Sequence, residues 1–312
     1  MIKRFMVAVM LLITTASFGQ LKELTFEDAV MQQYRKFAPQ SLAMFQWVPD
    51  TDCYTYLEGY LTLMKASVKD KEAKEILTIQ DLNTKLGSEL NWFSGFEWKN
   101  ENEFWVSGGG KYYSYNTVDE KGRLIHGLDE EAENAKFHNG TENVAYTKKN
   151  NIYVHTGAGL KVIVTDNSDR NVVSGQAIAR SEFGITEGLF WSPDGSALAF
   201  YQKDETNVHD YPLLDINTTP GELISIKYPM AGQKSEKAKV GIYNLKSRET
   251  VFFSAREGEE NYLTNLSWTP DNKYVLIAEV NRDQNHMWLN VFDATTGKFV
   301  RTLFEEESET WT

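Results

Sequence analysis

The sequence has little of what stabilises many exported proteins, because it contains a single cysteine, Cys53, in 312 residues. No intrachain disulfide can form, so stability must come from packing. A lone cysteine beside Tyr54 at the start of a predicted strand is more often buried than reactive. No nearby base marks it as a nucleophile.

The chain also lacks the motifs that bind metals or phosphates, or that carry a hydrolase nucleophile. Gly108 to Lys111 is not followed by Ser or Thr and has strands on both sides, so we predict a hairpin turn rather than a P-loop. No serine lies in a Gly-x-Ser-x-Gly elbow, so we predict no catalytic residue in this chain. We expect no metal site and no cofactor, since zinc-type spacing is missing around the five histidines, at positions 126, 138, 155, 209 and 286.

Positive charge is scarce as well. The formal net charge is −12, from 32 Lys and Arg against 44 Asp and Glu. Nucleic-acid binding depends on clustered basic side chains, so we exclude a nucleic-acid partner.

Long hydrophobic runs are missing except at the N-terminus. Residues 1–19 have Lys3 and Arg4 before an apolar core and end in small residues, which predicts a secretory signal peptide. The alternative is an uncleaved membrane anchor, for which the segment is short. We expect an exported protein, either periplasmic or at the cell surface or secreted.

The clearest pattern that is present is a turn followed by a short apolar strand. It is strongest in Trp191-Ser192-Pro193-Asp194-Gly195, where Pro, Asp and Gly each favour a tight turn, before Leu198 to Tyr201. Related units begin at Trp47, Trp98, Phe137 and Trp268, and the spacings between successive units are 51, 39, 54 and 77 residues. The first three bracket the roughly 40 to 50 residues of one four-stranded propeller blade.

This repeat predicts an all-β fold, a β-propeller of about five blades, with an insertion at 211–239 that explains the longest spacing. We expect Trp47, Trp191 and Trp268 to pack in the core or at blade edges. The segment 24–41 fits one helix or an extended lead-in, and 65–86 fits a short helix or a decorated hairpin. Residues 300–304 predict another blade strand, after which the chain stops without closing the propeller, so we expect a fragment of a longer chain.

Several segments together resemble the N-terminal propeller of the dipeptidyl peptidase IV group, in the prolyl oligopeptidase family of serine peptidases. They are 183–185, 190–195, 199–201, 204–206, 228–232, 240–244 and 263–268, densest between Gly175 and Phe304. The resemblance implies an eight-bladed propeller followed by an α/β-hydrolase domain that carries the Ser, Asp and His. Residues 20–312 would be a partial N-terminal propeller domain, with the catalytic domain absent.

The resemblance also implies one substrate-binding residue, Glu182. In dipeptidyl peptidase IV a pair of adjacent glutamates in this loop binds the free α-amino group of the substrate. Here the loop reads Arg180-Ser181-Glu182-Phe183, so only Glu182 matches the motif. This pattern is more similar to that of prolyl tripeptidyl aminopeptidases, which release Xaa-Xaa-Pro. The alternatives for Glu182 are a solvated loop carboxylate or an ion-pair partner of Arg180.

Two functions remain open on the sequence. The first is the substrate-gating, amino-terminus-binding propeller of an exported serine exopeptidase that releases Xaa-Pro dipeptides or Xaa-Xaa-Pro tripeptides, with a homodimer possible for the full-length protein. The partners would be peptides with a free N-terminus and proline. The second is a non-catalytic envelope propeller that binds a peptide or protein partner. The fold alone does not decide between them.

Overall fold

The computed structural model describes residues 23–39, 41–70, 72–256 and 260–311, apart from the side chains of Arg180 and Ser181. The predicted signal peptide lies outside these residues. The chain divides into two units, 1–43 and 44–312. In the first unit, helix α2 (Phe26–Val30) is short and begins at a capping box, in which the Thr25 hydroxyl accepts a hydrogen bond of 3.0 Å from the Asp28 N–H.

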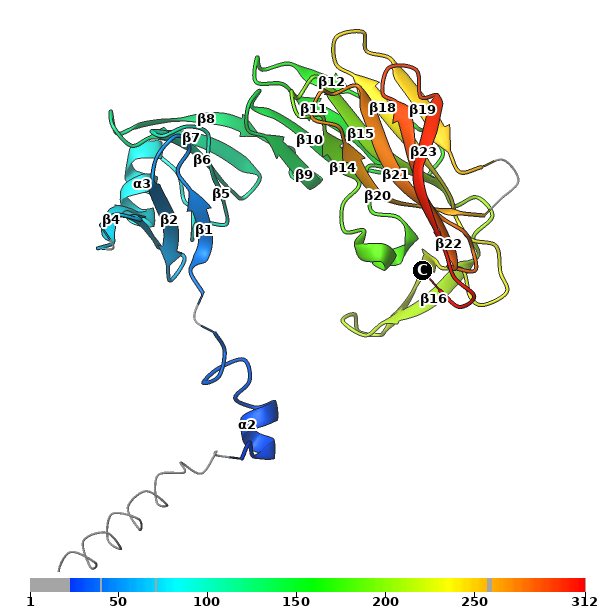
Figure 1. The fold of residues 1–312 in the computed structure, drawn as a ribbon, viewed down its shortest axis with the longest axis horizontal. Coiled ribbons are helices and arrows are strands. Elements are labelled where there is room, and N and C mark those ends of the chain that lie inside the picture. The colour runs from blue at the N-terminus through cyan, green and yellow to red at the C-terminus, as the bar shows by residue number, and fades with distance from the viewer. Residues whose placement is uncertain (1–22, 40, 71, 257–259, 312) are drawn as a thin grey trace, which may run out of the picture. The chain divides into compact units, whose positions relative to one another are not determined.

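The second unit is built of antiparallel sheets that follow one another along the chain (Figure 1). The first contains β1 (Ala43–Trp47), β2 (Cys53–Glu58), β3 (Thr62–Ser67) and β4 (Lys74–Thr78). The second contains β5 (Gly95–Trp98), β6 (Glu103–Gly108), β7 (Lys111–Asn116) and β8 (Lys121–Gly127). The third contains β9 (Glu133–His138), β10 (Asn143–Lys148), β11 (Asn151–His155) and β12 (Lys161–Ile163).

Two further sheets complete the set. The fourth contains β13 (Val172–Ser174), β14 (Leu189–Trp191), β15 (Ala197–Asp204), β18 (Lys237–Asn244) and β19 (Thr250–Ser254). The fifth contains β20 (Tyr262–Trp268), β21 (Tyr274–Val280), β22 (His286–Asp293) and β23 (Phe299–Glu307). Sheets of four antiparallel strands in sequence order are propeller blades, so the predicted all-β propeller with five blades is confirmed.

The five repeat markers of the sequence occupy equivalent places. Each marker lies at or next to the end of the first strand of its sheet. Trp47, Trp98 and Trp268 end β1, β5 and β20, and Phe137 is next to last in β9. In the fourth sheet β13 and β14 together form the first strand, and Trp191 ends β14. The turn-then-strand pattern therefore identified the same strand pair in every blade. The predicted strand at 300–304 lies within β23.

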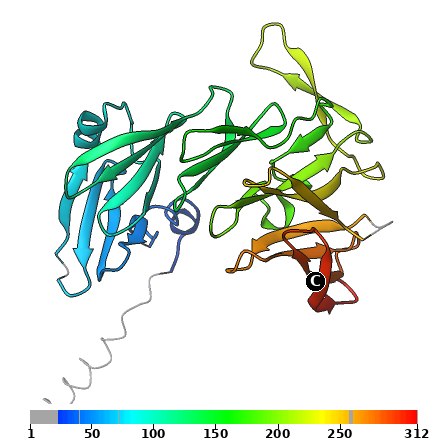
Figure 2. The same cartoon turned by 90° about the horizontal axis from the view of Figure 1, so that it is seen from above.

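The long fourth spacing comes from an insertion, as predicted, but the insertion occupies 205–236 rather than 211–239, because β18 already begins at Lys237. Between β15 and β18 the chain forms a separate hairpin of β16 (Asp210–Asp215) and β17 (Glu222–Lys227), which projects from the sheet in yellow-green in Figure 2. β15 and β18 pair directly with each other, up to Asp204 opposite Lys237. The insertion therefore leaves the ladder of the blade intact.

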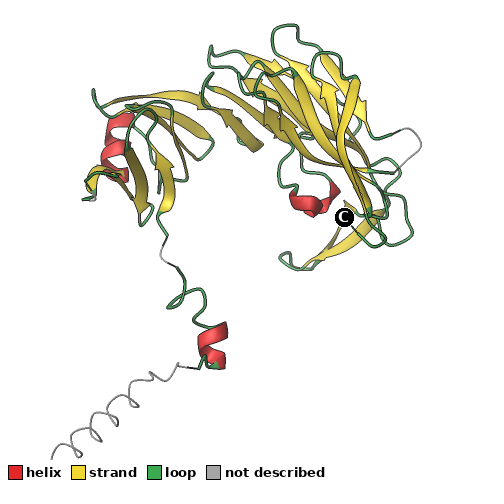
Figure 3. Ribbon diagram, viewed as in Figure 1, coloured by secondary structure: helices red, strands yellow, loops and turns green. Residues whose placement is uncertain are grey.

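Helices are minor elements of the second unit (Figure 3). The segment 65–86 contains both of the structures that the sequence left open, since β4 is followed by helix α3 (Ile79–Leu86). Thr78 caps α3 by accepting from the Asp81 N–H, and Gly87 ends it in the left-handed conformation. Among the described residues, no helix has the length and apolar character needed to cross a membrane.

Tryptophans join neighbouring sheets. The Trp98 indole donates to the Thr55 hydroxyl at 2.8 Å, the Trp191 indole to the Lys136 carbonyl at 2.9 Å, and the Trp268 indole to the Phe190 carbonyl at 3.0 Å. The prediction that these aromatic positions pack at blade edges is confirmed for Trp191 and Trp268. It is wrong for Trp47, which is 55% exposed and makes its ring contacts with Phe45 and Tyr54 of its own sheet.

Apolar cores lie between consecutive sheets. One joins the third and fourth sheets through Ile152, Val154, Leu198 and Phe200. A larger one joins the fourth and fifth sheets, where the rings of Phe253 and Phe292 stack 3.9 Å apart. Their members are almost fully buried, and each such side chain stabilises the fold by roughly 1.5–3 kcal/mol.

Two local predictions can also be compared with the structure. Gly109 and Gly110 form the turn between β6 and β7 with φ of 58° and 72°, so the predicted hairpin turn is confirmed. Cys53 is half-buried at the start of β2, with its thiol 3.8 Å from the Asp52 carboxylate.

Candidate functional site

The Glu182 loop interrupts the first strand of the fourth sheet. β13 pairs with the second half of β15, β14 pairs with its first half, and the loop leaves the sheet between them. At its base the Gly175 N–H donates to the Tyr201 carbonyl, and the Tyr201 N–H donates to the Gly188 carbonyl. A Cβ on Gly188 would lie 2.4 Å from the backbone of Gln176, so only glycine lets the two ends of the loop approach this closely.

Within this loop, residues Ala179–Gly184 form the 3₁₀ helix η1. Ile178 and Ile185 flank it and are buried in the core between the fourth and fifth sheets. Ala179 and Phe183 have φ of 52° and 55°, in the left-handed region that costs a non-glycine residue about 1–2 kcal/mol. Such strain persists only where surrounding contacts enforce it, and it clusters at functional sites.

Two distant contacts enforce this conformation. The Ala179 N–H donates a hydrogen bond of 2.9 Å to the Glu236 carboxylate, which lies 3.5 Å from the Lys203 ammonium. The ring of Phe183 packs against that of Tyr262 at the start of β20, 5.1 Å between centroids. The loop is therefore held from the end of the insertion and from the fifth sheet.

The loop forms one wall of a cavity of about 590 Å³, within the ~300–1,000 Å³ range of pockets that bind small ligands. The cavity lies at the end of the fourth and fifth sheets where β18 and β20 begin and where β19 and β21 end. Glu182, an exposed side chain of η1, is part of its lining. Segments from both sheets complete the lining: Ile178, Ala179, Tyr228, Pro229, Ser235–Ala238, Ser254–Arg256, Glu260–Leu263 and Arg282.

A second wall is built around Arg256, which follows β19. Its guanidinium lies 4.0 Å above the ring of Trp288, and its Nε atom is 3.7 Å from Oε2 of Glu279. Glu279 is only 2% exposed and accepts hydrogen bonds from the Arg256 N–H and from the amides of Asn261 and Asn290, at 2.8–2.9 Å. A buried carboxylate needs such partners, and here they also fix the arginine.

A second guanidinium, that of Arg282, also lines the cavity. It donates to the Tyr262 hydroxyl and lies 5.3 Å from the centre of the same ring. The cavity therefore combines carboxylates with guanidinium groups. Such a site can bind a molecule that carries an ammonium group and an anionic or carbonyl group.

One buried hydroxyl near the loop is unsuited to acid-base chemistry. Tyr201 lies beneath the loop in the core, and burial raises the pKa of its hydroxyl to about 12. The hydroxyl therefore stays protonated at neutral pH, and Tyr201 supports the loop through its backbone hydrogen bonds with Gly175 and Gly188.

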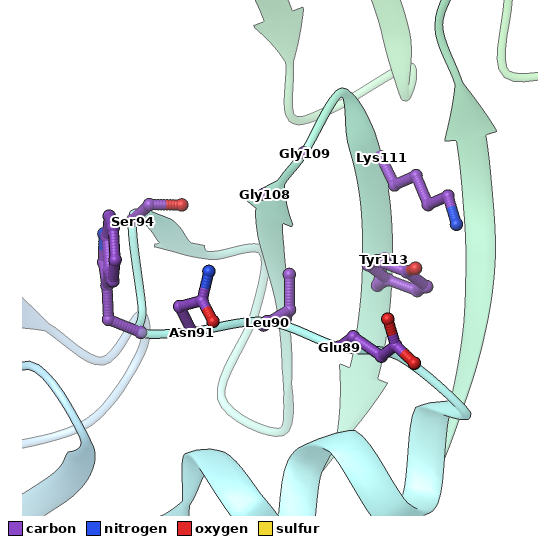
Figure 4. Close-up of a pocket in the computed structure, with 9 residues that line it drawn as sticks. Glu89, Leu90, Asn91, Ser94, Gly108, Gly109, Lys111 and Tyr113 are labelled. Atoms are coloured by element: carbon purple, nitrogen blue, oxygen red, sulfur yellow. The ribbon is translucent and has the colours of Figure 1, made fainter.

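A smaller cavity of about 350 Å³ lies on the second sheet (Figure 4). Figure 4 shows Glu89 and Leu90 on the loop that crosses the strands, and Lys111 and Tyr113 on β7. It involves one sheet and the loop before it, whereas the larger cavity joins two sheets, the insertion and η1. The larger cavity is therefore the candidate site. In the described part of the chain, no three His, Cys, Asp or Glu side chains come together to hold a metal ion.

The structure places the predicted residue Glu182 in this cavity. Its substrate-binding role stays a prediction, and an ion pair with Arg180 lies outside the described side chains. No sequence pattern predicts Glu236, Arg256 or Arg282 as residues of the site. Their neighbours in the site lie between 20 and 57 residues away along the chain, and no local motif records such contacts.

Comparisons with known proteins agree with this architecture. A family model described as Dipeptidyl peptidase IV (DPP IV) N-terminal region matches residues 93–312. A protein of Penicillium rubens named as a probable dipeptidyl-aminopeptidase B is 26% identical over 216 residues, which are 62% of this chain and 24% of that protein.

Two solved structures are similar as well. A protein of Bacteroides ovatus described as a putative dipeptidyl aminopeptidase IV has 33% identity and a TM-score of 0.76, over 87% of this chain and 38% of that one. Dipeptidyl peptidase 4 of Porphyromonas gingivalis shares the fold, with 18% identity and a TM-score of 0.69 over 93% of this chain and 43% of that one. The chain thus spans less than half the length of each of these relatives.

Proposed function

Because the chain belongs to the family of dipeptidyl peptidase IV (DPP IV) N-terminal regions, we propose that it binds the amino terminus of peptide substrates for an exported serine exopeptidase. The substrates are peptides with a free N-terminus and a proline, from which Xaa-Pro dipeptides or Xaa-Xaa-Pro tripeptides are released. The observation that carries this proposal is the position of Glu182, on a strained helix in the wall of a cavity of about 590 Å³.

The proposed role of this chain is binding and selection. A peptide ammonium that leaves water needs a carboxylate partner, and a charge-assisted hydrogen bond to Glu182 meets that need. Glu236 is already engaged by the Ala179 N–H and by Lys203, so Glu182 is the more available carboxylate. Acyl transfer by Ser, His and Asp would be carried by a part of the protein outside these 312 residues.

The length of the released peptide is a finer question. The family motif has two adjacent glutamates, and at that place this loop has Ser181-Glu182, with a single carboxylate. Loss of one carboxylate favours an amino terminus that lies one residue further from the catalytic centre. This supports tripeptide release, and substrate length is the measurement that decides it.

The predicted homodimer is retained as a proposal for the complete protein. The β16–β17 hairpin exposes apolar side chains, with Ile216 80% and Leu223 76% exposed. A second copy of the chain would cover this surface. The alternative function, a non-catalytic envelope propeller that binds a peptide or protein, uses the same cavity without a chemical step.

The test compares Glu182→Gln with the wild type in the complete gene product. Xaa-Pro and Xaa-Xaa-Pro chromogenic substrates are assayed with free and with acetylated amino ends. We expect only free-amine substrates to be cleaved, and kcat/KM to fall about 10- to 100-fold in Glu182→Gln, since an ionic hydrogen bond is lost.

The matched control is Glu187→Gln. Glu187 lies in the same loop, but its carboxylate pairs with Lys136, 2.7 Å away, and does not line the cavity. Its activity should match that of the wild type. Equal cleavage of blocked and free substrates would remove the role of Glu182. Absence of any peptidase activity would favour the binding propeller.

A further inference from the structure

Arg256 is held more rigidly than a surface arginine normally is. Its guanidinium lies over the ring of Trp288, 4.0 Å from the ring centre, and the ring of His286 stacks on the same Trp288 ring system, 3.8 Å between centroids. Trp288 therefore contacts both side chains. Glu279, which pairs with Trp288 across β21 and β22, fixes the edge of the guanidinium.

This arrangement is not needed to satisfy Glu279. The Glu279 carboxylate already accepts three hydrogen bonds, from the Arg256 backbone and from the amides of Asn261 and Asn290. The guanidinium lies 3.7 Å from it, beyond hydrogen-bond distance. Among the described residues, no acceptor lies within hydrogen-bond distance of the guanidinium N–H groups of Arg256. Arg256 also lines the cavity, where a ligand could supply that acceptor.

A planar guanidinium whose N–H donors have no acceptor in the described part of the chain is suited to a carboxylate, which it can bind through two parallel hydrogen bonds. The Arg282 guanidinium in the same lining adds positive charge. Holding the arginine in advance also lowers the entropy that binding must overcome. The cavity lining therefore carries the carboxylate of Glu182 and the guanidinium of Arg256.

We propose that Arg256 is a specificity-determining residue that binds an acidic side chain, Asp or Glu, in one of the residues before proline. This inference rests on the proposed function, in which Glu182 binds the amino terminus of the same peptide. Peptides with Glu at that position would be preferred over peptides with Gln, which has the same size and no charge.

The experiment uses the complete gene product and three substrate pairs that differ only in Glu against Gln: Glu-Pro and Gln-Pro, Glu-Ala-Pro and Gln-Ala-Pro, and Ala-Glu-Pro and Ala-Gln-Pro. We expect kcat/KM to favour Glu by about tenfold in at least one pair, as an ionic hydrogen bond allows. In Arg256→Gln this ratio falls to about one. In Arg256→Lys, which keeps the charge but loses the planar fork, it falls partway.

The control variant is Arg301→Gln, an exposed arginine of β23. It removes the same charge outside the cavity lining and should keep the ratio of the wild type. Arg256→Lys also guards against misfolding, because it retains a long apolar stem over Trp288. A ratio of one for the wild type in every pair would overturn the inference, as would a wild-type ratio in Arg256→Gln.

Direct binding separates this inference from the proposed function. Calorimetry measures the Kd of the free peptides Ala-Glu-Pro and Ala-Gln-Pro, and of their acetylated forms. One outcome is that acetylation leaves the Kd unchanged, while the wild type binds the Glu peptide more tightly than the Gln peptide and Arg256→Gln does not. In that case the role of Glu182 fails and that of Arg256 stands. If acetylation abolishes binding and the Glu and Gln peptides bind equally, Glu182 stands and Arg256 fails.

Discussion

The two ends of the fourth and fifth sheets are stabilised in different ways. At one end, here called the turn end, lie the turns 192–196, 245–249, 269–273 and 294–298. At the other, the pocket end, lie η1, the insertion and the connections after β19 and β21. Turn-end contacts are mostly local and repeated, whereas pocket-end contacts join distant residues and occur once.

The repetition is visible in the hydrogen bonds. Asp194 and Asp271 each accept from a hydroxyl two residues earlier and from the N–H two residues later. Neighbouring turns are then joined, because the Asp194 N–H donates to Asn272 at 3.1 Å. At the pocket end, the comparable links are Glu236 to Ala179 and Tyr262 to Phe183. The turn end therefore specifies the fold, and the pocket end specifies the site.

The largest expected effect follows from removing a turn-end tryptophan. Trp268→Ala loses a half-buried ring and leaves the Phe190 carbonyl without the indole donor. We expect a loss of about 3 kcal/mol in the free energy of unfolding. Chemical denaturation of the complete gene product measures it, with Trp47→Ala as control. Because Trp47 is 55% exposed, its loss should be below about 1 kcal/mol. Equal losses would contradict the assignment of Trp268 as a link between sheets.

A glycine at the base of the Glu182 loop tests the pocket end. In Gly188→Ala the new Cβ would meet the Gln176 backbone at 2.4 Å, so the loop must shift. We expect about 2 kcal/mol of destabilisation together with lower kcat/KM for free-amine substrates. Gly232→Ala is the control, since Gly232 has a φ of 79° but nothing within 4 Å of its Cβ, and only the strain of about 1 kcal/mol applies. Unchanged activity in Gly188→Ala would show that the geometry of η1 is unimportant.

The smallest effect concerns acid sensitivity at Glu142, in the turn between β9 and β10 of the third sheet. Burial raises the pKa of Glu142, but hydrogen bonds from Arg123 and Lys99 outweigh it and hold the pKa below its ordinary value. A carboxyl group whose pKa is lower in the folded than in the unfolded state stabilises the fold at pH values above its unfolded-state pKa, which is about 4.3 for glutamate. This contribution is lost as the pH falls through the folded-state pKa. Glu142→Gln should therefore cost about 1 kcal/mol at pH 7 and progressively less below pH ~4.3.

Thermal unfolding between pH 7 and pH 3 measures this difference. The control is Glu120→Gln, whose partner Lys85 lies in an exposed pair, and at pH 7 it should change stability less than Glu142→Gln does. Glu142 joins the third sheet to the second through Arg123 and Lys99. An equal loss of unfolding free energy in Glu142→Gln at pH 3 and at pH 7 would show that these ion pairs do not stabilise the fold.

The turn end could be predicted from the sequence because its determinants are neighbours in the chain. Ser192-Pro193-Asp194-Gly195 contains the whole turn, and its relatives at 47, 98, 137 and 268 identified every blade. The exposure of Trp47 could not be predicted, since burial depends on what packs against a strand. The same holds for Arg256, whose position depends on Glu279 and Trp288, 23 and 32 residues away.

The attachment of the insertion has a consequence for how such proteins diversify. Asp204 and Lys237, where the insertion leaves and rejoins the blade, are opposed residues of one ladder. Segments grafted at such a point can lengthen, shorten or be replaced by a two-residue turn while every other strand keeps its register. The length of this segment, which brings Tyr228 and Glu236 to the cavity wall, can therefore change without a change in the strand register of the blade. The insertion is therefore a point at which the cavity wall can change while the ladder of the blade stays the same.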